Sequence, residues 1–325
     1  MKNILIPVVA AVALAGCFCG VKAPKCPGNT LVGQWGLKLP YADMNAGHLI
    51  VEKEADGTLK GLMLWRWASP LPTKYVKTGE NGAFELQHAW GQVVKGQVIG
   101  GTLVAKAYEN GKEIGDVVGW RNRPACPKAS TKQAKFGAPV DLLKDGLDGW
   151  FPMSDKAPNG WSIKEEGGAK VLSNCLPVNE KGEKIHGVNL MSKRADFFDF
   201  NLSYDVRVPK KSNSGVYLRG RYEIQTLDSY GEKVDCHNMA AYYGRVTPSV
   251  AAEKPAGEWQ HVDVTIYRKH LTVVLNGTTI IDDVPMTGIT GGAIDANETV
   301  PGPIYIQGDH SDADYRNMIL RPAVD

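Results

Sequence analysis

The residues best suited to chemistry lie in "GVYLRGRYEIQTLDSYG", residues 215–231. Arg219, Glu223, Gln225 and Asp228 stand there among apolar neighbours. A strand that only filled a core would not need a guanidinium, two carboxylates and an amide together. Carboxylates act as general acids or bases, and cationic or amide groups bind oxygens that gain negative charge. Side chains alternate along a strand, so Glu223 and Gln225 are predicted to share one face, with Arg219 alongside on the preceding strand.

The spacing of the two carboxylates weakens one enzymatic interpretation. A conventional glycosidase needs two carboxyl groups about 5–10 Å apart across the scissile bond. Glu223 and Asp228 are five positions apart, so a regular strand directs them to opposite faces. We expect Asp228 to cap the turn "DSYG" instead. A structural alternative remains for Arg219 and Glu223, namely a buried salt bridge that only braces the fold.

A second polar cluster follows in "QGDHSDADYRN", residues 307–317. Asp309 and His310 come just after a predicted strand, and Arg316 lies on the next one. A histidine beside carboxylates is a candidate general base, because its ordinary pKa is close to neutral pH. Asp309 and Arg316 are candidate substrate-binding residues. His237, in the predicted long loop "DCHNM", is another.

The sequence offers only weak signals for a metal. Asp309, Asp312 and Asp314 could gather calcium, an oxygen-binding ion, but their spacing matches no EF-hand loop. No C-x-x-C or paired histidine spacing indicates zinc. We therefore expect no required cofactor and no metal site, with a divalent ion such as calcium kept as a minor hypothesis.

The elements that must position these residues are predicted to be strands. In "FNLSYDVRV", residues 200–208, apolar and polar positions alternate with the period of a half-buried strand. "HLTVVLNGTTIIDD" is typical of a hairpin that turns at Asn276 and Gly277. Several such strands without intervening helices indicate a two-sheet antiparallel sandwich in the second half of the chain.

The first half has a different pattern. Short strands recur about every ten residues between 29 and 122 and are separated by Asp-Gly and Asn-Gly turns, which favours a small antiparallel barrel or sandwich. The polar stretch "CPKASTKQAKFGAPV", residues 126–140, lacks periodicity and is interpreted as a linker. The chain is therefore predicted to be all-β, with a small β domain at 24–127, a linker at 128–140 and a sandwich domain at 141–325.

The N-terminus is predicted to be an export signal, residues 1–23. A lysine, a short apolar run and small residues follow in that order, and the run is too short to span a bilayer as a mature anchor. "LAGC" resembles the bacterial lipobox, which implies lipidation of Cys17. Cleavage after "VKA" would instead release a soluble protein. The expected location is the periplasm or the outer membrane as a lipoprotein, or the medium.

Charge and cysteine content narrow the partners. With 37 basic and 35 acidic residues the chain has no strong field that would attract nucleic acid, and contact with a membrane is expected only through a lipid anchor.

In an oxidising compartment disulfides are the default, and Cys26 and Cys126 stand on either side of the first β segment, where a bridge would join its ends. Cys175 and Cys236 are left as a second bridge or two buried thiols.

Several motifs in the second half together resemble a known family. They are "LLKDGLDGW", "DFNLSYDVRVPKKSNSGVYLRGRYEIQTLDSYG", "AGEWQHVDVTI" and "GPIYIQGDHSDADYRNMIL". Residues 141–325 resemble the 3-keto-disaccharide hydrolase domains, which implies a concanavalin-like jelly-roll sandwich. "CHNMAAYYG" and "HSDADYRN" depart from the family's usual residues, and the first domain lies outside the resemblance.

The resemblance implies a carbohydrate substrate already oxidised to a ketone at C3. That ketone acidifies the hydrogen at C2, so a modest base can remove it, and the C1 oxygen then leaves by β-elimination, with or without later addition of water. We expect His310 or Glu223 to be the base. Arg219, Gln225 and Arg316 are expected to bind the sugar and the developing oxyanion. The alternative is a non-catalytic, lectin-like carbohydrate-binding surface protein, because sandwich folds serve both purposes.

Overall fold

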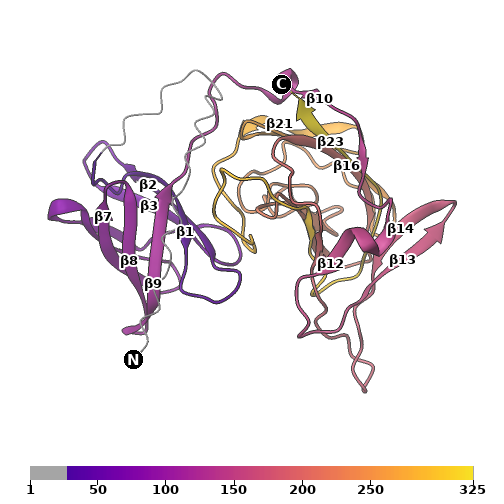
Figure 1. The fold of residues 1–325 in the computed structure, drawn as a ribbon, viewed down its shortest axis with the longest axis horizontal. Helices are drawn as coiled ribbons and strands as arrows, with labels where there is room; N and C mark the ends of the chain where they lie inside the picture. The colour runs from indigo at the N-terminus through magenta and orange to yellow at the C-terminus, as the bar shows by residue number, and fades with distance from the viewer. Residues whose placement is uncertain (1–27, 325) are drawn as a thin grey trace, which may run out of the picture.

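The computed structural model describes residues 28–324 and confirms an all-β chain built from antiparallel sheets (Figure 1). The predicted export signal with Cys17, and also Cys26, lie outside these residues. Within residues 28–324, none of the helices has the length and apolar character needed to cross a membrane. The helices are short 3₁₀ turns: η1 (Glu80–Gly82), η2 (Thr131–Gln133) and η3 (Gly146–Gly149).

The first half of the chain forms one nine-stranded sheet that closes into a barrel. Its strand order is β4-β3-β2-β1-β9-β8-β7-β6-β5, so the two ends of the sheet, β4 and β5, are consecutive in the chain and bring its edges together. Thr73, between them, donates its backbone N–H to the carbonyl of Gly61 on β3 at 2.8 Å. The strands are β1 (Gly33–Lys38), β2 (Ala46–Lys53), β3 (Leu59–Trp65), β4 (Leu71–Pro72), β5 (Tyr75–Thr78), β6 (Ala83–Gln87), β7 (Val93–Ile99), β8 (Thr102–Glu109) and β9 (Lys112–Arg121).

The second half forms a jelly-roll-like sandwich of two sheets. The larger sheet has the path β13-β14-β23-β16-β19-β20-β21, and the smaller has the order β12-β15-β22-β17-β18. The larger sheet contains β13 (Trp161–Glu166), β14 (Ala169–Asn174), β16 (Phe200–Arg207), β19 (Gln260–Tyr267), β20 (His270–Leu275), β21 (Thr278–Pro285) and β23 (Ala313–Val324), with β10 (Lys135–Phe136) and β11 (Val140–Asp141) paired to β23. The smaller contains β12 (Trp150–Pro152), β15 (Leu190–Ser192), β17 (Asn213–Leu218), β18 (Tyr222–Leu227) and β22 (Tyr305–Ile306).

Two local predictions about the sandwich are confirmed. Phe200, Leu202 and Tyr204 on β16 are fully buried, as the alternating pattern predicts for the inward face of a strand. The hairpin between β20 and β21 turns at Asn276 and Gly277, which have φ values of 51° and 83°. Two positive φ angles in a two-residue turn are the reason that an Asn-Gly pair is favoured there.

The segment predicted as a linker is docked on the sandwich. The backbone N–H of Thr131 donates to the carboxylate of Asp283 at 2.7 Å, and Ser130 forms a capping box with Gln133 around η2. β10 and β11 then pair with the last strand, β23. The segment therefore connects the two halves and also extends the larger sheet.

The barrel packs directly against a loop of the sandwich, residues 286–296. A Cβ at Gly291 would lie 2.3 Å from the carbonyl oxygen of Ala68, and the N–H of Gly292 donates to the carbonyl of Arg66 at 2.8 Å. Ala46 and Leu64 of the barrel belong to the same buried apolar cluster as the core of the sandwich. In Figure 1 yellow loops of the sandwich reach toward the indigo strands of the barrel. This contact brings the loop after β3 to one side of the candidate site.

Candidate active site

One row of side chains crosses the face of the smaller sheet that is turned away from the apolar core, called the outer face here. Met191 on β15 is opposite Tyr305 on β22, Tyr305 is opposite Tyr217 on β17, and Tyr217 is opposite Glu223 on β18. Cross-strand partners point to the same face, so the four side chains form a continuous line. Residues next to them in the chain, such as Val216, point the other way into the core.

Glycine at position 215 makes room for the Glu223 carboxyl group. A Cβ at Gly215 would lie 2.3 Å from Oε1 of Glu223 and 2.8 Å from its Cγ. Any other residue at position 215 would therefore displace the carboxyl group. Gly215 pairs with Gln225, which is buried on the same face as Glu223, as the alternation predicted.

Glu223 is held as a neutral carboxylic acid. Burial raises its pKa to about 8, and the negative charge of Asp309 acts in the same direction, while a hydrogen bond from the Tyr217 hydroxyl to the ionised carboxylate opposes them. The hydroxyl of Tyr217 lies 2.8 Å from Oε2 of Glu223 and 2.9 Å from the carbonyl of Gly291. A hydroxyl has one hydrogen, so both contacts are satisfied when the acid donates to Tyr217 and Tyr217 donates to Gly291.

The more accessible chemistry lies at one end of this face, where Asp309 and His310 follow β22. Nδ1 of His310 lies 2.7 Å from a carboxylate oxygen of Asp309, and this hydrogen bond raises the pKa of the imidazole. Among residues 28–324 no group forms a hydrogen bond with Nε2 of His310, and the side chain is one-third exposed. A carboxylate that fixes Nδ1–H leaves the lone pair of Nε2 free to accept a proton.

Asn189, which the sequence did not single out, anchors this dyad to the row of tyrosines. Its Oδ1 accepts the backbone N–H groups of Gly308 and Asp309 at 2.9 and 3.1 Å. Its Nδ2 donates to the hydroxyl of Tyr305 at 3.1 Å, and the ring of Tyr305 stacks on Tyr217 with centroids 4.1 Å apart. The side-chain amide of Asn189 thus links the loop that carries Asp309 and His310 to the row of side chains that ends at Glu223.

The predicted site residues are only partly brought together. Glu223, Gln225, Asp309 and His310 gather at the outer face, although Glu223 is only 3 % exposed and Gln225 only 2 %. The face that Glu223 and Gln225 share is therefore covered at this end, because the loop that carries Thr290 and Gly291 packs against Glu223 and Tyr217. The structure leaves the Asp309–His310 end accessible.

Arg316 was predicted beside these residues, and the structure contradicts that placement. It lies on β23 in the larger sheet, where its Nε donates to Asp205 at 3.1 Å and its guanidinium lies 4.1 Å from the ring centroid of Trp259. Its neighbour Tyr315 points into the core. Alternation therefore puts Arg316 on the far side of the sandwich from Glu223.

Arg219 is also turned away from Glu223. It lies in the turn after β17, where its guanidinium donates to the carbonyls of Glu298 and Val300 at 2.6 and 2.8 Å. It lies 4.3 Å from the ring centroid of Phe198, and the residue is 1 % exposed. The alternative salt bridge with Glu223 is not formed, and Arg219 instead holds the loop 298–300.

We predict that Arg219→Met destabilises the fold without changing KM for the substrate. Two carbonyls would lose a charged donor in a buried place, which costs about 2–3 kcal/mol. Urea denaturation and KM should be measured together, with Arg194→Met as control, because Arg194 forms an exposed pair with Asp196 and its loss should cost less than about 1 kcal/mol. A raised KM with unchanged stability would instead assign Arg219 to substrate binding.

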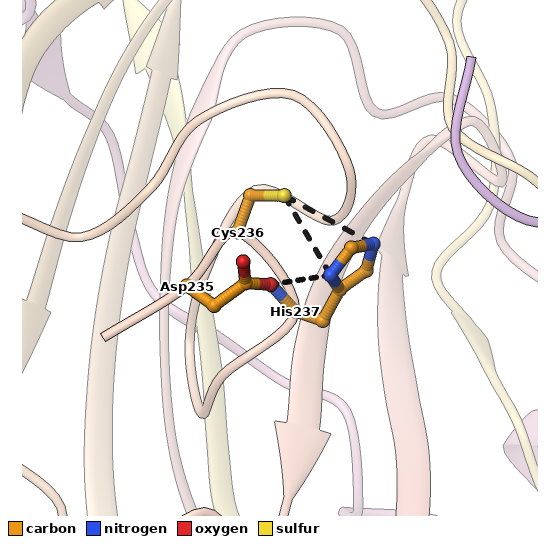
Figure 2. Close-up of side chains that lie close together, drawn as sticks. All are labelled: Asp235, Cys236 and His237. Carbon is orange, nitrogen blue, oxygen red and sulfur yellow. Dashed lines mark hydrogen bonds and ion pairs between the residues drawn. The ribbon is translucent and has the colours of Figure 1, made fainter. Parts of the chain in front are cut away.

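His237 lies at the edge of the outer face, with residues from distant parts of the chain. Nε2 of His237 is 2.6 Å from the hydroxyl of Ser69, which the barrel supplies. The ring of Tyr243 lies 5.1 Å from that of His237. Burial raises the pKa of the Tyr243 phenol, and so does Glu223 once its carboxyl group is ionised. Figure 2 shows His237 with Asp235 and Cys236 around a common space. No sequence signal pointed to Ser69, 168 positions away.

The calcium hypothesis is not supported by the positions of the three aspartates. Asp309 is bonded to His310, Asp312 accepts from the backbone of Leu176 and from Lys184, and Asp314 is paired with Arg207. Each carboxylate thus has its own partner.

Asp228, predicted to cap the turn that follows it, accepts the backbone N–H of Lys211 instead.

The cysteine predictions have mixed outcomes. Cys126 is disulfide-bonded, and Cys26, the partner that the sequence predicts, lies outside the described residues. Cys175 and Cys236 are both free, and the first is exposed while the second is partly buried. The suggestions of a second bridge and of two buried thiols are therefore both wrong.

The second half of the chain is similar to a known family and to several solved structures. The family model described as a 3-keto-alpha-glucoside-1,2-lyase-like domain matches residues 140–321, more than half of the 325 residues. A solved structure from Parabacteroides distasonis, described as a candidate glycosyl hydrolase, is 24% identical over 57% of this chain and 83% of that one, with a TM-score of 0.43. A second from the same organism is 17% identical over 58% and 95%, with a TM-score of 0.45.

A carbohydrate-binding module from Bacillus subtilis is also similar in structure. It is 10% identical over 53% of this chain and 95% of that one, with a TM-score of 0.34. No curated protein matches the chain at a significant level.

Proposed function

The chain belongs to the family of 3-keto-alpha-glucoside-1,2-lyase-like domains, and on this basis we propose that it cleaves the glycosidic bond of 3-keto-glycosides. The observation that carries the proposal is the Asp309–His310 pair, with a free Nε2 at the accessible end of a face whose other carboxyl group, Glu223, is neutral. Two titratable groups with separated roles are typical of acid–base catalysis at one site.

We assign the base to His310. Its Nε2 takes the proton from C2, which the C3 ketone acidifies, and the electron pair moves into an enolate. The enolate then forms the C1–C2 double bond as the C1–O bond breaks, and the glycosidic oxygen leaves with its electron pair and takes the proton back from the imidazolium. Water added to the unsaturated keto sugar would complete a net hydrolysis.

Glu223 is a positioning residue in this proposal. It is buried, so it does not reach the substrate, and its neutral form donates to Tyr217 within the row that leads to Tyr305. A neutral acid beneath the site also avoids a buried negative charge that would oppose enolate formation. The sequence leaves the base open between His310 and Glu223, and the greater exposure of His310 favours His310.

Gln307 is the best candidate for binding a sugar hydroxyl. Its backbone N–H donates to the carbonyl of Gly215 at 2.9 Å, and alternation from Tyr305 places its side chain on the outer face. Its Oε1 is buried and has no hydrogen-bond partner among the described residues. Buried acceptors are normally paired, so the unpaired Oε1 of this partly exposed residue supports a role in which the Gln307 side chain turns outward to accept a hydroxyl hydrogen from the substrate.

The test compares a 3-keto-glucoside with its unoxidised parent. We expect release of the aglycone only from the keto sugar, because the C2 hydrogen of the parent is not acidified. In deuterated water, the sugar product should show the new C1–C2 double bond, or deuterium at C2 if water has been added. Equal cleavage of both sugars would contradict the proposal, and binding of the keto sugar without turnover would favour the lectin-like alternative.

A further inference from the structure

Asp235, Cys236 and His237 form the one group among residues 28–324 in which three side chains of metal-ligating type converge. One carboxylate oxygen, the thiol sulfur and a ring nitrogen all lie within 4.8 Å of one another. Figure 2 shows the three side chains close together, with dashed lines from the sulfur of Cys236 to both ring nitrogens of His237 and from Nδ1 to the carboxylate of Asp235. The sequence predicts no metal site here, because three consecutive ligands match neither an EF-hand loop nor a C-x-x-C or paired histidine spacing.

The separations suit a small tetrahedral ion. The sulfur of Cys236 is 3.6 Å from Nδ1 of His237. Bonds of about 2.3 Å from zinc to sulfur and about 2.0 Å from zinc to nitrogen, at a tetrahedral angle, place those two atoms about 3.5 Å apart. The oxygen of Asp235 is in direct contact with the same nitrogen. A cation bound by all three groups would need an outward movement of the carboxylate and a rotation of the thiol or of the imidazole ring, because the sulfur lies almost equally far from the two ring nitrogens.

The barrel orients the histidine as a metal ligand requires. Ligating histidines commonly donate the N–H of the other ring nitrogen to an oxygen, which fixes the tautomer and the ring orientation. Nε2 of His237 lies 2.6 Å from the hydroxyl oxygen of Ser69. With its proton on Nε2, His237 turns the lone pair of Nδ1 toward the carboxylate of Asp235, while the thiol of Cys236 lies beside the ring, 3.6 Å from Nδ1 and 3.9 Å from Nε2.

The backbone of this turn is also fixed in place. The carbonyl of Cys236 accepts the N–H of Gly244 at 3.0 Å, and Asn238 donates from its side chain to the carbonyl of Lys233 at 3.1 Å. The side chains of Asp235 and His237 remain 57% and 43% exposed, so an ion can enter from solvent. The three ligands thus stand on a supported turn with one side open.

We propose that Asp235, Cys236 and His237 bind one divalent transition metal ion of the zinc type, with Ser69 orienting His237 and a fourth position open. Three protein ligands plus an open position is the arrangement of catalytic rather than structural zinc sites. Tyr243 lies edge-on to the ring of His237, and its backbone N–H donates to the carbonyl of Glu223 at 3.1 Å, so the ion would lie at the edge of the outer face. The inference goes beyond the proposed lyase function and does not depend on it, because metal binding is measured without a sugar.

The experiment is a titration of the full chain, stripped with a chelator, with Zn²⁺ and with Co²⁺. We expect one Zn²⁺ per chain by calorimetry and by metal analysis after dialysis. With Co²⁺ we expect a thiolate-to-cobalt charge-transfer band in the near ultraviolet. Cys236→Ser should abolish the band and the stoichiometric binding, and Ser69→Ala should keep the band but weaken Zn²⁺ binding about 10–100-fold.

Cys175→Ser is the matched control, because Cys175 is the other free thiol among the described residues and is exposed. It should leave both the band and the affinity unchanged. Circular dichroism of each variant will show that the fold is kept. The proposal is overturned if the wild type takes up no stoichiometric Zn²⁺, if Cys236→Ser binds as tightly as the wild type, or if the band is lost with Cys175 instead.

Discussion

Replacement of His310 by alanine is expected to lower kcat on a 3-keto-glucoside by about 10²–10⁴-fold, the usual contribution of a positioned general base. The physical reason is the free Nε2 lone pair of His310, whose ring is oriented by the hydrogen bond between Nδ1 and Asp309. The measurement is aglycone release under saturating substrate, together with loss of C2 hydrogen in deuterated water. Both should fall together, because proton removal precedes cleavage.

The control for this variant is His186→Ala. The ring of His186 lies 3.1 Å from the backbone carbonyl of Asp309, so it is adjacent to the same loop, but it is exposed and does not contact His310 through its side chain. Its loss should leave kcat nearly unchanged. If His310→Ala retained the wild-type rate of C2 exchange, another group would be the base.

The pH dependence gives a second readout for the same dyad. The neutral imidazole is the active base, so kcat/KM should rise with pH through the pKa of His310, which Asp309 raises above its ordinary value of 6.5. Asp309→Asn removes the negative charge that raises the pKa of His310, so the rise of kcat/KM with pH should move to lower pH. The value of kcat should also fall, because the imidazole ring loses its orientation. A merely structural role of Asp309 would lower activity without shifting the pH at which kcat/KM rises.

Glu223→Gln is expected to change the pH dependence of stability by a few kcal/mol. In the wild type, burial raises the pKa of this carboxyl from 4.5 to about 8, so the folded state holds a proton that the unfolded chain releases. The stabilisation is fully present below pH 4.5 and is lost as the pH rises through about 8. Glutamine does not titrate, so the fall in the free energy of unfolding between pH 4.5 and about 8 should disappear in the variant. The variant should therefore be more stable than the wild type at about pH 8 and above.

The same variant separates two roles of Glu223. Glutamine has nearly the shape of the neutral acid, and its amide can still donate to Tyr217, so turnover should be largely retained. Urea denaturation at several pH values checks stability, and Glu180→Gln, at an exposed position, should keep the wild-type slope. An unchanged slope in Glu223→Gln would mean that Glu223 is not held neutral, and a folded but inactive variant would mean that Glu223 itself transfers a proton.

Some features of the site were within reach of the sequence but were missed. A turn at Arg219–Arg221 puts Tyr217 opposite Glu223 in a hairpin, and Gly215 opposite Gln225. The pattern "GVYLRGRYEIQ" therefore contained the tyrosine and the glycine that shape the environment of Glu223. Ser69 and Asn189 carried no comparable signal, because their roles depend on contacts between distant segments.

The sequence by itself determined the strands, their faces and the turns, because alternation and Asn-Gly pairs are local properties of the chain. It also placed Glu223 and Gln225 on one face and Asp309 beside His310, because these pairs are separated by one or two positions. Only the tertiary structure decided that Arg316 lies on the other sheet, that Arg219 holds a loop, and that Glu223 is buried and neutral. Those outcomes depend on how the sheets stack and on which loops cover them. The contact between Ser69, in a loop of the barrel, and His237 likewise cannot be predicted from either segment alone.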